Sequence, residues 1–171
     1  MRTIEFTSLA VCLTLVSCAL PRNAWYTLRV TVAPDANSRT PVPVDLVFVW
    51  DKATAAKVAA LTASDWFAKK AQFRQDDPDA RALTICEWEW VPAQAVPDIS
   101  LMVPAAARKW ARGVFVFAHY RSEGPHRSIV RPGATAILDL GRDDLTLRSI
   151  GTATPQGAPL DQACPAQATP R

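Results

Sequence analysis

YTLRVTV at residues 26–32 and VDLVFVW at residues 44–50 are the two stretches of sequence that decide the fold. In the first stretch, apolar side chains alternate with Thr and Arg, a period of two that is typical of a strand with one buried face. In the second stretch both alternating sets are largely apolar, so we expect a central strand that is buried on both faces. A polar, turn-rich segment joins the two strands.

Six further segments have strand patterns and are separated by Pro or Gly. They are residues 83–91, 99–103, 113–120, 128–130, 135–140 and 145–150. Many short strands at this spacing are typical of a β-sandwich. We therefore predict an all-β fold with a small helical insertion: a transthyretin- or immunoglobulin-like β-sandwich of about seven or eight strands, spanning residues 25–151.

The period changes after Asp51, which predicts a helical insertion at about residues 52–75. Thr62-Ala63-Ser64-Asp65 resembles a capping box, in which a Thr and an acidic side chain satisfy the first backbone N–H groups of a helix. Trp66 follows it, and with Phe67, Lys69 and Lys70 it could form an exposed patch. Packing of this helix onto the sandwich is the favoured alternative.

The N-terminus carries a short uncharged apolar segment, residues 8–17, that is too short to cross a membrane. It ends in Leu15-Val16-Ser17-Cys18, which looks like a lipobox, the bacterial pattern that precedes an acylated cysteine. The sequence therefore predicts a lipoprotein signal peptide at residues 1–17 and lipidation of Cys18, because the thiolate is the group that accepts the lipid. The alternative is an ordinary secretory peptide that is cut elsewhere.

Residues 18–24 are expected to form a lipidated tether. Ala19 follows the cysteine in place of the aspartate that commonly retains such proteins in the inner membrane. Resemblance to sorted lipoproteins thus implies an outer-membrane location, with the domain facing the periplasm. The two or three acyl chains of such a protein would hold it to the membrane almost irreversibly.

Composition and charge exclude several classes of protein. The chain has 171 residues, 19 basic and 16 acidic, and no run of like charges that would suit a nucleic-acid backbone. Clustered histidines and Cys-x-x-Cys pairs are absent from the sequence, so a zinc site is not supported. We expect no nucleic-acid partner and no cofactor apart from the covalent lipid on Cys18.

Two cysteines remain in the mature chain, Cys86 in a strand pattern and Cys164 in a Pro- and Ala-rich tail at residues 152–171. An oxidising compartment permits a disulfide between them. The alternative is one buried thiol and one thiol without a role. The composition predicts that the tail is mostly unstructured.

An enzyme is not expected. His119 follows an apolar strand and His126 lies in a Gly-Pro turn, and neither has a nucleophile at a recognisable spacing. We assign no catalytic residues.

Two other kinds of site are weighed and set aside. The acidic group at residues 76–79 lacks the ligand spacing of an EF-hand, so a solvated turn is preferred to a calcium site. Trp50, Trp88 and Trp90 could form a sugar-binding platform, but at strand spacing such side chains are more often part of a core.

Several segments resemble the type VI secretion lipoproteins of the TssJ family. Residues 32–44 are similar to the first loop and second strand of that family, and Ser64-Asp65-Trp66-Phe67 occupies the place of its helical insertion. Residues 113–121 and 138–143 resemble its Gly-Val-rich strand and its closing hairpin. The Trp-rich residues 86–91, and Ala93-Gln94 in place of a Pro-Gly-like turn, depart from the family pattern.

The resemblance implies a structural role without a reaction. It implies an outer-membrane lipoprotein whose β-sandwich binds the periplasmic domain of an inner-membrane secretion component, TssM. A periplasmic ligand- or glycan-binding lipoprotein outside any secretion system is the alternative.

The loop between the first two strands would contribute to the partner surface, because loops on a rigid scaffold carry binding residues. The competing interpretation is that this loop is a plain connection between the two strands. Its candidate residues are Pro34, Asp35, Asn37, Ser38 and Arg39.

Overall fold

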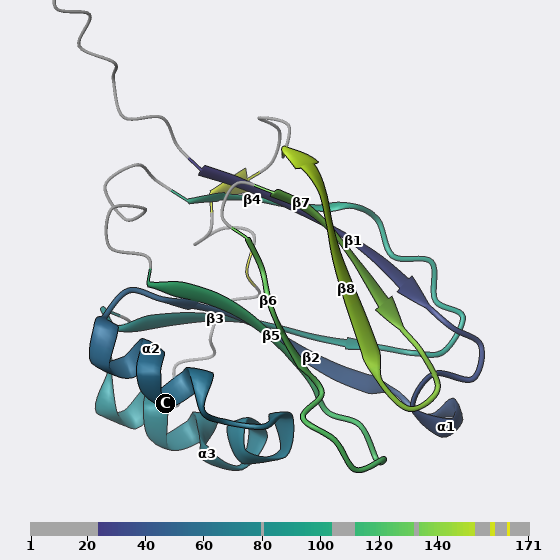
Figure 1. Cartoon of the computed structure of the whole chain (residues 1–171), viewed down its shortest axis with the longest axis horizontal. Helices are drawn as coiled ribbons and strands as arrows, with labels where there is room; N and C mark the ends of the chain where they lie inside the picture. The colour runs from purple at the N-terminus through teal and green to yellow at the C-terminus, as the bar shows by residue number, and fades with distance from the viewer. Residues whose placement is uncertain are drawn as a thin grey trace, which may run out of the picture.

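The computed structural model describes residues 24–79, 81–103, 112–131, 134–152, 158–159 and 164. The predicted signal peptide, Cys18 and the tether up to residue 23 lie outside the described residues. Within them the chain forms two packed β-sheets, with helices against one outer face (Figure 1). The expected fold class, an all-β sandwich with a small helical insertion, is confirmed.

One sheet has the strand order β8-β7-β1-β4-β9 and the other has the order β3-β2-β5-β6. The strands are β1 (Ala24–Val32), β2 (Val42–Val49), β3 (Leu83–Trp90), β4 (Ile99–Val103), β5 (Gly113–Ala118), β6 (Arg127–Ile129), β7 (Ala134–Leu140), β8 (Leu145–Thr152) and β9 (Ala158–Pro159). The eight expected strands are all present, and β9 is additional. β1 pairs in parallel with β7 and antiparallel with β4.

The main core lies between the two sheets. The apolar side chains of β1 that alternate in the sequence, Leu28 among them, pack here against Leu46 and Phe48 of β2 and Leu138 of β7. Full burial of each such side chain contributes about 1.5–3 kcal/mol. The period-two pattern therefore predicted the buried face of β1 correctly.

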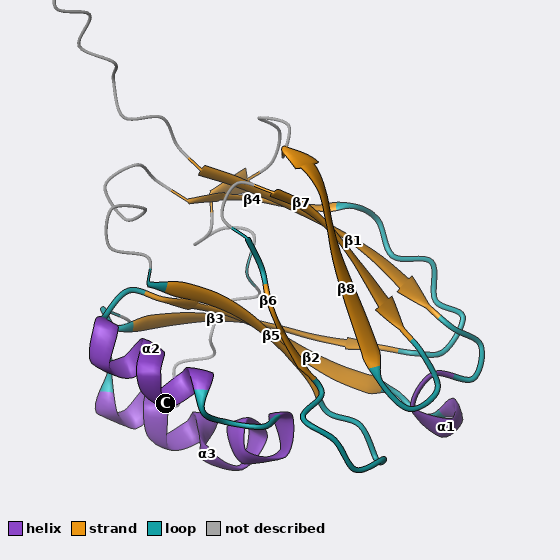
Figure 2. Cartoon of the chain, in the orientation of Figure 1, coloured by secondary structure: helices purple, strands orange, loops and turns teal. Residues whose placement is uncertain are grey.

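The helical insertion covers the outer face of the β3-β2-β5-β6 sheet (Figure 2). It consists of α2 (Lys52–Ala59) and α3 (Ala63–Asp76), and α3 begins with the predicted capping box between Thr62 and Asp65. Trp66 is fully buried and stacks on Phe117 of β5, with 5.1 Å between the ring centroids. The packing interpretation of Trp66 is thus confirmed, and an exposed patch around it is wrong.

This second core explains why both faces of β2 are apolar. Val47 and Val49 face the helices, whereas Leu46 and Phe48 face the other sheet. β2 hydrogen-bonds to β3 on one side and to β5 on the other. The prediction of a central strand that is buried on both faces is confirmed.

One carboxylate lies inside the helix–sheet interface. Asp45 of β2 is 1% exposed, and it accepts hydrogen bonds from Trp66 Nε1 at 2.8 Å and from Lys70 Nζ at 2.9 Å. Lys70 also pairs with Glu87 of β3 at 2.6 Å, and Arg74 pairs with the same carboxylate. Burial raises the pKa of Asp45, although the hydrogen bonds from Lys70 and Trp66 oppose that effect. The sequence analysis did not anticipate this polar network.

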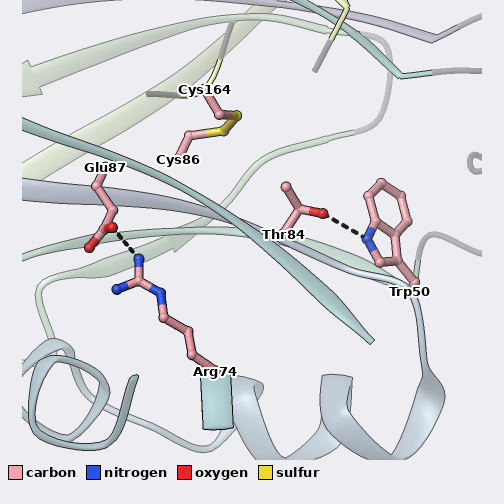
Figure 3. The surroundings of a disulfide bond; sticks show 6 residues. All are labelled: Trp50, Arg74, Thr84, Cys86, Glu87 and Cys164. Atoms are coloured by element: carbon pink, nitrogen blue, oxygen red, sulfur yellow. Dashed lines mark hydrogen bonds and ion pairs between the residues drawn. A yellow bond between two sulfur atoms is a disulfide. The ribbon is translucent and has the colours of Figure 1, made fainter. Parts of the chain in front are cut away.

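The predicted mostly unstructured tail contains ordered contacts. β9 pairs in parallel with β4, and Cys164 is buried in a disulfide with Cys86 of β3, with 4.6 Å between the Cα atoms (Figure 3). Cys86 and its neighbour Glu87 point to opposite faces of β3, Glu87 toward Arg74 of α3. Because β9 belongs to one sheet and Cys86 to the other, residues 158–159 and Cys164 are joined to opposite sheets.

Candidate protein-binding surface

The loop between β1 and β2 contains a tight turn, α1 (Ala36–Arg39), with unusual backbone angles. Three consecutive residues have positive φ: Asn37 at 46°, Ser38 at 54° and Arg39 at 65°. A left-handed conformation costs an L-residue about 1–2 kcal/mol, and Asn tolerates it better than most. A run of three such residues therefore has to be held in place by neighbouring contacts.

Asn37 supplies much of that support. Its side chain is 4% exposed, donates from Nδ2 to the carbonyl of Pro41 at 2.8 Å, and accepts at Oδ1 from the backbone N–H of Arg121 at 2.8 Å. Of the five loop residues predicted to contact a partner, Asn37 points into the protein. Pro34, Asp35, Ser38 and Arg39 are exposed.

Two other loops lie beside this turn. The loop at residues 119–126 joins β5 to β6, and the loop at residues 141–144 joins β7 to β8. The backbone N–H of Asn37 donates to the carbonyl of Gly141 at 3.2 Å, and that of Ser38 donates to the carbonyl of Arg142 at 3.3 Å. Together with the Arg121 contact, these bonds join three loops from distant parts of the chain at one end of the sandwich. We call this surface, formed by residues 33–41, 119–126 and 141–144, the three-loop end.

His126 fixes the second loop to the third. The ring is 5% exposed, and its Nδ1 lies 2.9 Å from the Asp144 carboxylate while Nε2 lies 2.8 Å from the carbonyl of Ser122. The ring thus bridges residues 122 and 144 across the two loops. A Cβ on Gly124 would lie 2.7 Å from this ring, which explains the glycine at that position.

A pocket of about 300 Å³ opens at the surface between two of the loops. It is lined by Asp35, Ser38 and Arg39 of the first loop and by Arg142 of the third. The hydrogen bond from Ser38 to the Arg142 carbonyl sets the position of one wall against the other. Arg142 is not among the residues predicted from the sequence to bind a partner, although residues 138–143 are part of the resemblance.

The other candidate residues have structural contacts. His119 is exposed and its ring stacks on Phe67 of α3, with 4.8 Å between the centroids. Asp77 accepts three backbone N–H bonds, from residues 81–83, and so closes the turn after α3. Among the described residues, no group of three or more acidic, His or Cys side chains is placed to hold a metal ion.

The tryptophans that could have formed a sugar platform belong to the main core. Trp90 is 4% exposed, and Trp50 and Trp88 are partly buried against the core residues between the sheets. The Trp50 indole donates to Thr84 Oγ1 at 3.1 Å (Figure 3). The core interpretation of these three side chains is confirmed.

None of the helices among the described residues is long and apolar enough to cross a bilayer.

Comparison with known proteins gives matches in structure alone. No protein-family model and no curated protein matches the sequence. The structure is similar to the type VI secretion lipoprotein TssJ1 from Pseudomonas aeruginosa, with a TM-score of 0.55 and 15% identity, over 77% of this chain and 100% of that one. It is also similar to Lip of Serratia marcescens, a membrane-bound component of the type VI secretion system, with a TM-score of 0.52, 13% identity and the same coverage. The chain therefore has the transthyretin-like β-sandwich fold of these lipoproteins.

Proposed function

We propose that this protein is a structural component of a type VI secretion system. In this proposal a lipid on Cys18 holds it to the outer membrane, and its sandwich lies in the periplasm. There it binds the periplasmic domain of a TssM-like inner-membrane component, and it performs no reaction. The observation that carries the proposal is the similarity of the fold to TssJ1 and Lip, which extends over 77% of this chain and 100% of each of those chains.

The direction of β1 supports this role. The chain enters the sandwich at Ala24, and nine residues of β1 lead to the three-loop end. At about 3.3 Å per residue this strand is about 26 Å long, so the entry point and α1 lie at opposite ends of the sheet (Figure 1). A lipid attached just before β1 would leave the three-loop end facing away from the membrane.

The organisation of the loops supports binding of a protein. A preformed surface loses less conformational entropy when it binds than a flexible loop does. Backbone and side-chain bonds from residues 37, 38 and 122 hold the three loops in one arrangement, and polar side chains stay exposed on it. A standard interface buries about 800 Å² per partner, which is more than a single loop offers, so the three loops together are the better surface.

The test is crosslinking of the full-length lipoprotein in its own cells, followed by mass spectrometry of the proteins recovered with it. The expected result is a large inner-membrane secretion protein. Its recovery should fall sharply for Cys18→Ser, because the domain would lose its attachment to the outer membrane, and for Arg39→Ala. That variant keeps Asn37, which the fold of the loop requires.

The matched control removes an arginine elsewhere. Arg29 forms an exposed ion pair with Asp98 at 3.0 Å on the five-stranded sheet, and Arg29→Ala should leave recovery unchanged. Recovery of envelope glycan alone, with no protein partner, would contradict the secretion role and favour a ligand- or glycan-binding lipoprotein.

A further inference from the structure

We infer that the pocket between Arg39 and Arg142 binds a carboxylate side chain of a partner protein. The inference deepens the proposed function, on which it rests, because it states the chemistry of the segment that the three-loop end recognises. The partner segment is an exposed loop that presents an Asp or Glu at its tip. The carboxylate lies between the two guanidinium groups.

The described arginines differ in whether they form ion pairs. Arg29, Arg74, Arg81 and Arg148 each form an ion pair with a carboxylate. In the part of the chain that the structure describes, the guanidinium groups of Arg39 and Arg142 have neither an ion-pair partner nor a hydrogen-bond partner. Both arginines nevertheless line the same pocket, although 103 positions separate them in the sequence.

Backbone geometry holds the two arginines together. Arg39 is the last of the three left-handed residues, and its N–H donates to the carbonyl of Asp35 at 3.3 Å. Arg142 is fixed from the other side, because its carbonyl accepts the N–H of Ser38. Like charges repel, so the two arginine side chains do not hold each other in place, and the backbone bonds of residues 38 and 39 position the segments that carry them. Converging guanidinium groups on a rigid support bind carboxylates with paired, charge-assisted hydrogen bonds.

The size and the remaining lining residues favour a side chain as the occupant. About 300 Å³ is at the lower end of the volumes of small-molecule sites, and it suits one or two side chains. The Ser38 hydroxyl offers a further donor to the carboxylate. Two arginines and Asp35 give the lining of the pocket a net charge of +1. This charge favours one bound carboxylate and opposes the binding of two.

Asp35 makes it possible to test the sign of the charge on the group that occupies the pocket. If the occupant is a carboxylate, Arg39→Ala and Arg142→Ala weaken partner binding by about tenfold each, the usual effect of losing a hydrogen bond to a charged group. Asp35→Asn should strengthen binding, because it removes a like charge. A basic occupant would reverse both signs and overturn the proposal.

The experiment places a photo-crosslinking amino acid at Asp143 in the full-length chain, in its own cells. This exposed position neighbours Arg142, and its hydrogen bond from Ser122 uses the backbone carbonyl of residue 143, so the pocket is left intact. The crosslinked partner is identified by mass spectrometry, and its yield is compared between wild type, Arg39→Ala, Arg142→Ala and Asp35→Asn. Arg131→Ala is the matched control, because Arg131 is an exposed arginine near the opposite end of β5, where Val130 bonds to Val114.

The supporting result is a crosslinked peptide with an Asp or Glu close to the attachment point, a lower yield for both arginine variants and an unchanged yield for Arg131→Ala. Replacing that acidic residue of the partner with Arg should restore binding to Arg39→Glu. Resistance to protease in each variant checks that the loops are folded.

Other outcomes separate the two proposals. If the same partner is captured with equal yield from the arginine variants, the pocket proposal is overturned while the secretion role stands. If neither this crosslinker nor general crosslinking recovers an envelope protein, both proposals fail.

Discussion

Asn37 illustrates how one polar side chain can be mistaken for a binding residue. It lies in a polar loop among exposed residues, and nothing in the local sequence separates it from Asp35 or Ser38. In the folded protein its amide group satisfies the carbonyl of Pro41 and the N–H of Arg121, 84 positions away. Its role is to position the exposed residues of the three-loop end.

We expect Asn37→Ala to lower the free energy of unfolding by about 1–3 kcal/mol, because two backbone groups lose their partner. The measurement is urea denaturation. Ser38→Ala is the control, since Ser38 has a similar left-handed φ but its exposed side chain makes no hydrogen bond within the described residues. Equal effects of the two substitutions would show that backbone strain, and not the amide bonds, decides the stability of the turn.

Trp66 is the central side chain of the helix–sheet interface. It combines complete burial with a hydrogen bond to Asp45, so it contributes packing and also compensates a buried charge. We expect Trp66→Ala to cost about 3–5 kcal/mol of stability. Trp66→Phe should cost about 1–3 kcal/mol, because an aromatic ring remains but Asp45 loses one donor.

Thermal and urea unfolding of both Trp66 variants would check the order of these effects. The intermediate stability of Trp66→Phe is the informative result. If Phe were as damaging as Ala, the hydrogen bond to Asp45 would outweigh the packing of the ring. If Phe were neutral, Lys70 alone would satisfy that carboxylate.

The helix α3 is joined to the sheet by ionic contacts as well as by packing. Lys70 bridges Asp45 and Glu87, and Arg74 binds Glu87 from the next turn of the helix. Desolvation acts to raise the pKa of Glu87, but the hydrogen bonds from Lys70 and Arg74 outweigh it and lower the pKa. The position of the insertion therefore depends on the ionisation of a sheet residue.

This pKa shift predicts a pH dependence with a definite sign. The pKa of Glu87 is lower in the folded state than in the unfolded state, so its ionised form adds stability above the unfolded pKa. That stability is lost as the pH falls through the folded pKa. We expect wild type to lose more stability than Glu87→Gln between pH 6 and pH 3. Urea denaturation of both at each pH is the measurement, and parallel pH profiles would contradict the assignment.

The molecule as a whole is closed by its tail. Two contacts, the pairing of β9 with β4 and the disulfide from Cys164 to Cys86, connect the edges of opposite sheets. The disulfide joins two residues that are 78 positions apart. In the chain-entropy treatment, a cross-link over that distance raises the free energy of the unfolded chain by about 4 kcal/mol, because it lowers the entropy of that chain. The described residues of the Pro- and Ala-rich tail, 158–159 and Cys164, thus belong to the folded domain.

Cys164→Ala is therefore expected to lower the urea midpoint markedly. Wild type treated with a reductant should unfold at the same urea midpoint as Cys164→Ala without reductant, because both lack the disulfide. The double Cys86→Ala, Cys164→Ala variant controls for the free thiol that remains in the single variant. A midpoint of Cys164→Ala equal to that of oxidised wild type would show that the tail adds no stability.

The sequence by itself determined the eight principal strands, the helical insertion and the central place of β2. Each follows from a local pattern: alternation at a period of two, a capping box, or Pro and Gly between segments. Burial on both faces could be read from Val44–Trp50 because every position of a strand reports on one face or the other. The direction of the side chains of β1 was fixed in the same way.

Only the tertiary structure decided the contents of the candidate site. Arg142 and Arg121 reach the first loop through hydrogen bonds of their backbone groups to Ser38 and Asn37, about 80–100 positions away, and no periodic pattern records such contacts. His126 joins the second loop to the third through its ring. The same holds for Asp45, which reads as an ordinary polar position until α3 covers it, and for Cys164, which the tail brings to Cys86. Local patterns determine which face of an element is buried, whereas the meeting of loops depends on how whole elements pack.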